Sequence, residues 1–200
     1  MDPVIWQSTV ATSLEHSFLF SRYVLPYMQA KKSGRIIFTS SSAAHFSGGM
    51  SGYVLGKMGQ VRLAEIIHVE NFRQNNIKCF AYTPGGVKTR FYYDFEDRAL
   101  GREPAADSIA FKEKGAAGQE KSAAFAYSMM KDMPFDEPSL AAGCVTALAA
   151  GKLNFMSGRY VDSTVSIEDY IRDAEKIRAL DLHRIRLRWS HEVHEPVVDF

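Results

Sequence analysis

The chain has 200 residues, of which 46% are hydrophobic and 24% are charged, and its formal net charge is +1. This length and composition are typical of one soluble globular domain with a sizeable core. The nearly neutral charge gives no electrostatic reason to expect nucleic acid or an anionic membrane as a partner. No apolar run approaches the ~18 residues of a membrane-spanning helix, so an integral membrane protein is not expected.

Two cysteines, Cys79 and Cys144, lie in apolar segments, which favours buried free thiols in a reducing compartment. The segment 1–7 contains an acidic residue and lacks the basic region of a secretory signal. We therefore expect a cytoplasmic protein whose residues 1–200 form a single domain.

In chain order, the first expected element is a long helix. Apolar residues recur at helical spacing over residues 3–30, and Pro26 should kink or end this helix. Residues 31–34 read as a basic helix C-terminus with a glycine stop. Residues 35–40 are β-branched and aromatic, which predicts a short buried strand, and the small residues 43–52 predict a loop.

The pattern of helix and strand then repeats. Residues 53–73 predict a second long helix, and residues 77–82 predict a second buried strand that ends before Pro84. Over residues 91–137 the pattern weakens, apart from an alanine-rich helical stretch near 116–130. A long segment of this kind between regular elements is often a lid, so we expect a substrate lid here.

The last third of the chain has shorter elements. Residues 137–150 predict a helix and residues 158–162 a short strand. Ser166 to Asp169 resembles a capping box, which would open a helix reaching about Leu180. The tail, residues 182–200, alternates basic and apolar side chains at first, as a surface strand or an arm on a neighbour would. Its arginines are expected to be solvated or to lie at an interface: Arg184, Arg186 and Arg188.

Strands that alternate with long helices predict an α/β fold with a parallel sheet of about three strands. The most informative side chains are Tyr53 and Lys57, which share one helix face and follow the serine run 40–42. A nearby ammonium favours a phenolate and brings a tyrosine closer to neutral pH as a proton donor or acceptor. A serine hydroxyl could hold a substrate oxygen against this tyrosine. The alternative is a surface Tyr and Lys on an amphipathic helix.

Several segments in order resemble the short-chain dehydrogenase/reductase (SDR) superfamily, and within it a fungal-type branch. The resemblance spans roughly residues 3–165 and rests on three main segments: Gly34-Arg-Ile-Ile-Phe-Thr-Ser40-Ser41, Tyr53-x-x-x-Lys57 and Pro84-Gly85-x-Val87-x-Thr89. It implies a truncated Rossmann-like three-layer fold. The family's opening strand, its T-G-x-x-x-G-x-G turn and its N-N-A-G stretch are not in the sequence. The chain therefore resembles the C-terminal half of that fold, without the nucleotide-binding half.

The resemblance also implies roles for individual residues. Tyr53 would be the general acid or base, Lys57 would favour its phenolate, and Ser41 would donate a hydrogen bond to the substrate oxygen. Counting back from Tyr53 gives Ser40 instead, but Ser41 is preferred because strand register fixes which side chain points into the site. The place of the family's relay asparagine falls on Ser13, whose hydroxyl can hold a water with a shorter reach.

By the same resemblance, NAD(P)H would be the cofactor, and four residues would contact its nicotinamide: Pro84, Gly85, Val87 and Thr89. A dinucleotide pyrophosphate needs a glycine-rich helix N-terminus, which this sequence does not show. Three functions therefore stay open. They are an SDR-type carbonyl reductase or alcohol dehydrogenase for a small, secondary-metabolite-like carbonyl compound, a cofactor-independent isomerase, dehydratase or cyclase, and a non-catalytic remnant.

Other side chains leave alternatives open. His45 could face the substrate or be solvated, and no metal site is expected because His191 and His194 lack a third ligand. Aromatic and methionine residues of the lid could line an apolar pocket or only pack the lid: Phe91, Tyr92, Tyr93, Phe95, Met129, Met130 and Met133. The resemblance implies a homodimer through the two long helices, around residues 10–22 and 61–72.

Overall fold

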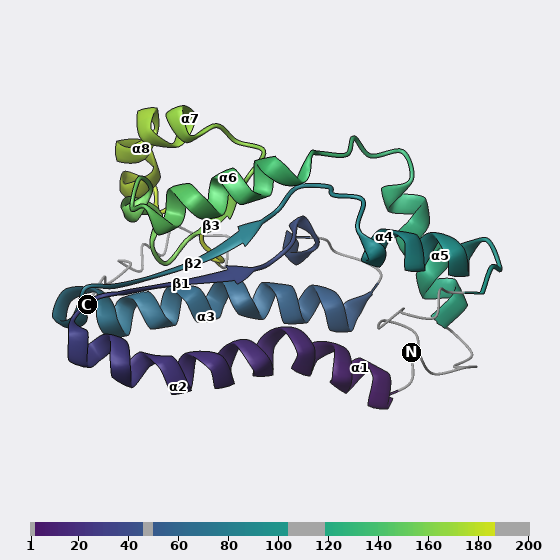
Figure 1. Ribbon diagram of the computed structural model, residues 1–200, viewed down its shortest axis with the longest axis horizontal. Coiled ribbons are helices and arrows are strands. Elements are labelled where there is room, and N and C mark those ends of the chain that lie inside the picture. The colour runs from purple at the N-terminus through teal and green to yellow at the C-terminus, as the bar shows by residue number, and fades with distance from the viewer. Residues whose placement is uncertain (1–2, 46–49, 104–118, 187–200) are drawn as a thin grey trace, which may run out of the picture.

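The computed structural model describes residues 3–45, 50–103 and 119–186. A parallel sheet of three strands, in the order β1-β2-β3, lies between two layers of helices (Figure 1). Its strands are β1 (Gly34–Thr39), β2 (Ile77–Thr83) and β3 (Tyr160–Asp162). Their register aligns Phe38 with Ala81 and Ala81 with Tyr160. The predicted α/β fold with a three-stranded parallel sheet is confirmed.

One helical layer consists of two long, paired segments. The first comprises α1 (Pro3–Val10), the π-helix η1 (Ala11–Glu15) and α2 (His16–Lys31), which follow one another without a break. The second is α3 (Ser51–Asn75), which lies between this segment and the sheet (Figure 1). A core between α3 and the sheet includes Ile36, Phe38, Val61, Ala64, Ile67 and Ala81.

The end of the first segment differs from the expectation in two respects. Helix α2 continues through Pro26 to Lys31, because Leu25 and Met28 pack on the core and hold this last part of the helix in place. The left-handed residue after the helix is Lys32, with φ 49°, and not a glycine. Gly34 instead opens β1, where a side chain would collide with Met28.

The opposite layer covers the other face of the sheet. It contains α6 (Pro138–Ala149), the short 3-10 turn η3 (Asn154–Met156), α7 (Ile167–Arg172) and α8 (Ala174–Ala179). Their shared core includes Phe80, Leu148, Leu153, Met156 and Val161. Ser166 caps α7 by accepting a hydrogen bond from Asp169 N at 3.0 Å, as its capping-box pattern predicts.

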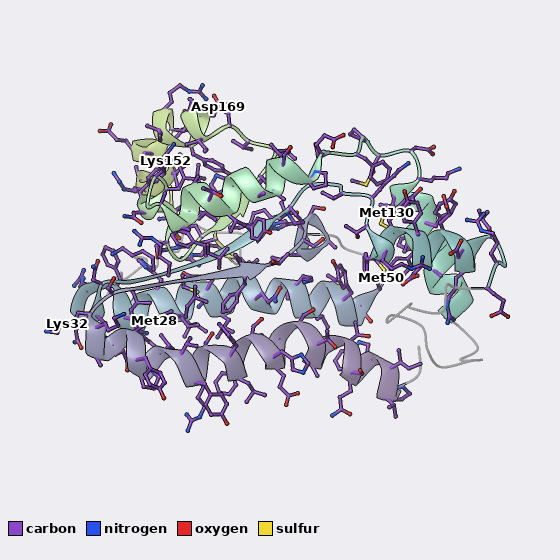
Figure 2. The ribbon with its side chains drawn as sticks, in the orientation of Figure 1. Met28, Lys32, Met50, Met130, Lys152 and Asp169 are labelled. Atoms are coloured by element: carbon purple, nitrogen blue, oxygen red, sulfur yellow. The ribbon has the colours of Figure 1, made fainter. Side chains whose placement is uncertain are left out.

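Two helices, α4 (Arg90–Ala99) and α5 (Gln119–Met130), pack on each other at one end of the molecule (Figure 1). Between them lies a small core of Phe95, Ala123 and Ala126, against which Met50 and Met130 pack (Figure 2). The helix α5 was expected, whereas α4 was not. Neither α3 nor any other helix in the described ranges is long and apolar enough to cross a bilayer.

The described start of the tail, residues 182–186, is not a strand, so that expectation is wrong there. Asp181 and His183 have left-handed backbone, which turns the chain back on itself. The expectation of a solvated Arg184 is also wrong: its side chain is 2% exposed and forms ion pairs with Asp181 at 2.9 Å and Glu65 at 3.7 Å. His191 and His194 lie outside the described residues.

Candidate active site

The carboxyl ends of the three parallel strands meet at one edge of the sheet. Thr39 ends β1, Thr83 ends β2 and Asp162 ends β3. The amino-terminal part of α3, which carries Tyr53 and Lys57, follows the turn after β1, where η2 (Ser42–His45) lies. Ligands of open parallel sheets commonly bind at this edge.

The two serines at the end of β1 have different partners. Ser40 is 2% exposed, and its hydroxyl donates to the backbone oxygen of Lys57 at 2.9 Å. Ser41 is half-buried and accepts a hydrogen bond from Ala43 N at 3.1 Å, and its hydroxyl is near enough to the phenol of Tyr53 to affect the pKa of that group. Of the two serines that the sequence left open, the structure brings Ser41 to Tyr53.

Lys57 lies under the same tyrosine. Its Nζ donates to the Thr39 carbonyl at 2.8 Å and lies 5.5 Å from the centroid of the Tyr53 ring. Burial lowers the pKa of Lys57. Burial also raises the pKa of Tyr53, and the Ser41 hydrogen bond offsets only part of that rise. The expected lowering of the Tyr53 pKa is therefore not met, because desolvation outweighs the ammonium, whose donor is directed at Thr39.

Ser13 is buried inside the π-helix η1, at the contact with α3. A Cβ at Gly56 would lie 2.9 Å from the Ser13 Cβ, so this glycine lets the two helices approach closely. The Ser13 carbonyl accepts hydrogen bonds from Gln60 Nε2 at 3.0 Å and Ser17 Oγ at 2.6 Å. These contacts lead to Gln60, about one helical turn beyond Lys57. A proton relay through Ser13 stays a prediction.

The loop after β2 holds the four residues that the resemblance assigns to a cofactor. Gly85 has left-handed backbone with φ 79°, and a side chain there would collide with Asp136. Gly86 N donates to Asp136 Oδ2 at 2.9 Å, and Asp136 N donates to Gly86 O at 2.6 Å. Val87 is half-buried and Thr89 is exposed at the start of α4. The loop therefore lies at the same edge of the sheet as Tyr53, and its two hydrogen bonds with Asp136 hold it in place.

The lid aromatics divide between the two expected roles. Phe91 stacks on Tyr53, with ring centroids 5.7 Å apart and an interplanar angle of 28°. Phe95 packs edge-on against Phe91 at 4.8 Å and belongs to the core between α4 and α5. Tyr92 is also buried, whereas Met129 is 47% exposed. Phe91 thus covers the face of the candidate catalytic tyrosine, while its neighbours hold the helix in place. Tyr93 and Met133 are exposed as well.

Sequence reasoning missed a second phenol at this edge. Tyr160 is 7% exposed, and burial raises its pKa, to which the charge of Tyr53 adds a smaller effect. His45 packs edge-on against the Tyr160 ring, with centroids 4.6 Å apart. The strand pattern around residue 160 predicted a strand, but no spacing links that residue to this edge, because its place beside His45 depends on the pairing of β3 with β2.

Known proteins share both sequence and fold with the chain. Residues 1–99 match the family model described as short chain dehydrogenase. A short-chain dehydrogenase/reductase of Talaromyces verruculosus is 33% identical over 101 residues, which cover 50% of this chain and 39% of that protein. The asnovolin H dehydrogenase of Aspergillus novofumigatus is 36% identical over 89 residues, or 44% of this chain and 34% of that one. A short chain dehydrogenase of Monascus purpureus is 22% identical over 187 residues, or 93% and 53%.

The chain thus spans about a third to a half of the length of these curated relatives. Among solved structures, a short chain dehydrogenase/reductase family protein has a TM-score of 0.57 at 20% identity, covering 82% of this chain and 58% of that one. A halohydrin dehalogenase bound to ethyl (2S)-oxiran-2-ylacetate also has a TM-score of 0.57 at 20% identity, covering 96% and 64%. At this identity the two structures bear on the fold alone.

Proposed function

Because the chain belongs to the short-chain dehydrogenase/reductase superfamily, we propose that it is an oxidoreductase that interconverts a carbonyl group and an alcohol on a small molecule. The observation that carries the proposal is the position of Lys57, whose Nζ lies 5.5 Å from the centroid of the Tyr53 ring and donates to the Thr39 carbonyl at the end of β1, two residues before Ser41. These three groups can act together on one substrate oxygen.

In the reducing direction, Ser41 donates a hydrogen bond to the carbonyl oxygen and Tyr53 gives it a proton. Burial raises the pKa of Tyr53, so the phenol is protonated at neutral pH and begins as a donor. After transfer, the Ser41 hydroxyl and the Lys57 ammonium stabilise the phenolate. In the oxidising direction the same phenolate removes the proton of the alcohol.

A nicotinamide, when bound, supplies or accepts the hydride in this chemistry. The residues that would hold it are those of the loop after β2, Pro84, Gly85, Val87 and Thr89, together with Lys57. The glycine at position 85 supports this assignment, because its left-handed backbone and missing side chain let the loop pack closely on Asp136 and hold a fixed shape at this edge.

Three further features belong to the proposal. The segment 91–137 acts as a substrate lid, which is supported by the stacking of Phe91 on Tyr53 and by the closure of Asp136 onto Gly86. The fungal relatives, one of them named for asnovolin H, favour a secondary metabolite as the substrate. The protein acts as a homodimer in the cytoplasm, where the thiols of Cys79 and Cys144, both free in the structure, stay reduced.

The test is reduction of a panel of small ketones by the full chain with NADPH or NADH, followed by nucleotide absorbance. We expect Tyr53→Phe to lower turnover roughly 10²- to 10⁴-fold, since it removes the proton donor. Tyr23→Phe is the control, because it removes one hydroxyl from the outer face of α2 and keeps the ring, so its turnover should match the wild type. Equal turnover of Tyr53→Phe and wild type would contradict the assignment. If turnover needs Tyr53 but persists without nucleotide, the reaction is an isomerisation, dehydration or cyclisation and not a redox reaction.

A further inference from the structure

We propose that the hydroxyl of Tyr160 binds a second oxygen of the substrate, so that the site selects carbonyl compounds that carry a further neutral hydroxyl or carbonyl group. This inference rests on the proposed function, since it takes the reacting oxygen to lie at Tyr53. It assigns Tyr160 to substrate selection and not to proton transfer.

Strand pairing and a ring contact place Tyr160 beside the turn that follows Ser41. Tyr160 pairs with Ala81 of β2, two residues before that strand ends at Thr83. His45, the last residue of η2, packs edge-on against the Tyr160 ring, with centroids 4.6 Å apart. Because η2 begins directly after Ser41, the Tyr160 ring lies beside the turn that follows the candidate serine.

The hydroxyl at the end of this ring has no partner. Within the described residues, Tyr160 Oη is buried and has no hydrogen-bond partner. Buried polar groups are nearly always satisfied, and an exception at a candidate site calls for a ligand or an ordered water. A residue that only filled the core would serve equally well as phenylalanine.

Other buried tyrosines do not share this property. Tyr170 is 2% exposed, but its Oη accepts a hydrogen bond from Asp162 N at 2.7 Å and donates to Asp162 O at 3.2 Å. Tyr92 is 5% exposed and its hydroxyl bonds to Glu96 at 3.4 Å. The unsatisfied hydroxyl of Tyr160 is thus a particular feature of the carboxyl edge, beside Tyr53.

The surroundings limit what can bind there. The charge of Asp162 acts on the Tyr160 hydroxyl and disfavours a second negative charge, so a carboxylate or phosphate on the ligand would be repelled. His45 covers one side of the ring at 4.6 Å. A neutral oxygen, which can accept from or donate to a phenol, satisfies Tyr160 without this repulsion.

The test compares three small ketones as binding probes: cyclohexanone, 2-hydroxycyclohexanone and 4-hydroxycyclohexanone. Ligand-observed NMR titration of the full chain gives their affinities without any need for turnover. We expect wild-type protein to bind at least one hydroxyketone roughly three- to tenfold more tightly than cyclohexanone, which is what one net hydrogen bond supplies. In Tyr160→Phe this gain should disappear, while the affinity for cyclohexanone stays within about twofold.

Thermal unfolding of the ligand-free protein provides a second measurement. Tyr160→Phe removes only an unsatisfied hydroxyl, so its Tm should equal or exceed that of wild type. The matched control Tyr170→Phe removes a satisfied hydroxyl on the opposite face of the sheet, so its Tm should fall and its preference among the three ketones should not change. A fall in Tm for Tyr160→Phe as large as that for Tyr170→Phe would show that the hydroxyl already has a partner and would overturn the proposal.

The proposal also fails if wild-type protein binds the three ketones alike or binds none of them, or if Tyr160→Phe keeps the preference. Tyr53→Phe separates this outcome from the fate of the proposed reaction. If Tyr53→Phe keeps both full turnover and the preference, the reaction is wrong and the role of Tyr160 stands. If Tyr53→Phe abolishes turnover while Tyr160→Phe leaves the preference intact, the reaction stands and the role of Tyr160 is wrong.

Discussion

Ser40 and Ser41 lie at the point where β1 ends, and this position explains their different partners. The side chain of Ser40 still follows the alternation of side chains along the strand, so it faces α3 on the same side as Phe38. Its hydroxyl donates to the backbone oxygen of Lys57. Ser41 is the next residue, where the chain turns into η2, and its hydroxyl is free to reach Tyr53. Adjacent residues of one type therefore contribute to stability in one case and to the candidate site in the other.

Substituting each serine by alanine should separate the two contributions. Ser40→Ala removes a buried hydrogen bond and should cost about 0.5–1.5 kcal/mol in the free energy of unfolding. Ser41→Ala should leave that free energy within about 0.5 kcal/mol and lower kcat/KM by about tenfold or more, since one charge-assisted hydrogen bond to the substrate oxygen is lost. Urea unfolding and steady-state kinetics measure the two quantities. The reverse result, with Ser40 controlling turnover at unchanged stability, would exchange their roles.

The spacing of Tyr53 and Lys57 on one helix could be read from the sequence because helical geometry is local. The direction of the Tyr53 pKa shift could not, because it depends on how much of the ring the lid and the strand ends bury. Tyr160 was missed for a similar reason. Its distance from Tyr53 is set by the pairing of β3 with β2, which no local pattern specifies.

At the scale of elements, Asp136 ties two distant parts of the chain together. It lies just before α6, and its two hydrogen bonds with Gly86 fix the loop that leads from β2 into α4. Because Phe91 is at the start of α4 and stacks on Tyr53, the position of this loop determines how Phe91 covers the phenol. Asp136 is a positioning residue in this arrangement.

Removing the Asp136 carboxylate should loosen the lid more than the rest of the fold. Asp136→Ala should cost about 0.5–1.5 kcal/mol, increase hydrogen exchange in residues 84–99, and raise KM more than it lowers kcat. Asp136→Asn keeps an acceptor oxygen and should restore part of each effect. Asp132→Ala is the control, because the Asp132 side chain is 83% exposed. If hydrogen exchange in residues 84–99 is unchanged in Asp136→Ala, the hydrogen bond from Gly86 to the Asp136 carboxylate does not hold this segment in place.

The elements that sequence reasoning placed well are those with strong local patterns, such as the two buried strands and α3. Helix α4 was missed because its buried positions alternate aromatic and charged residues, and Asp94 is buried only through its ion pair with Arg90 at 2.7 Å. Arg184 was expected to be solvated because its burial depends on Glu65 of α3 as well as on the local ion pair with Asp181. The contact between the start of the tail and α3 is fixed by the tertiary structure and leaves no periodic signal in the sequence.

At the scale of the whole molecule, the outer face of the long helices exposes large apolar side chains. On α2, Phe20, Tyr23 and Tyr27 form a stripe at helical spacing and are 63%, 71% and 76% exposed. On α3, Ile66 and Phe72 are 42% and 43% exposed. An exposed apolar stripe such as the one on α2 usually marks an interface. The residues fall on the two helices that the sequence assigned to a homodimer, which is why a second copy of the chain is the proposed occupant.

A charge on each of the two helices should therefore disrupt assembly without unfolding the protomer. We expect wild-type protein to sediment as a dimer at micromolar concentration and the variant Phe20→Asp/Ile66→Asp as a monomer, because a desolvated carboxylate in an apolar interface is costly. Both positions are exposed in the single chain, so circular dichroism should show unchanged helix content. Ile171→Asp, at a position 53% exposed on α7 in the opposite layer, is the control and should remain dimeric. A monomeric wild type, or equal sedimentation of wild type and the double variant, would exclude the two long helices as the interface.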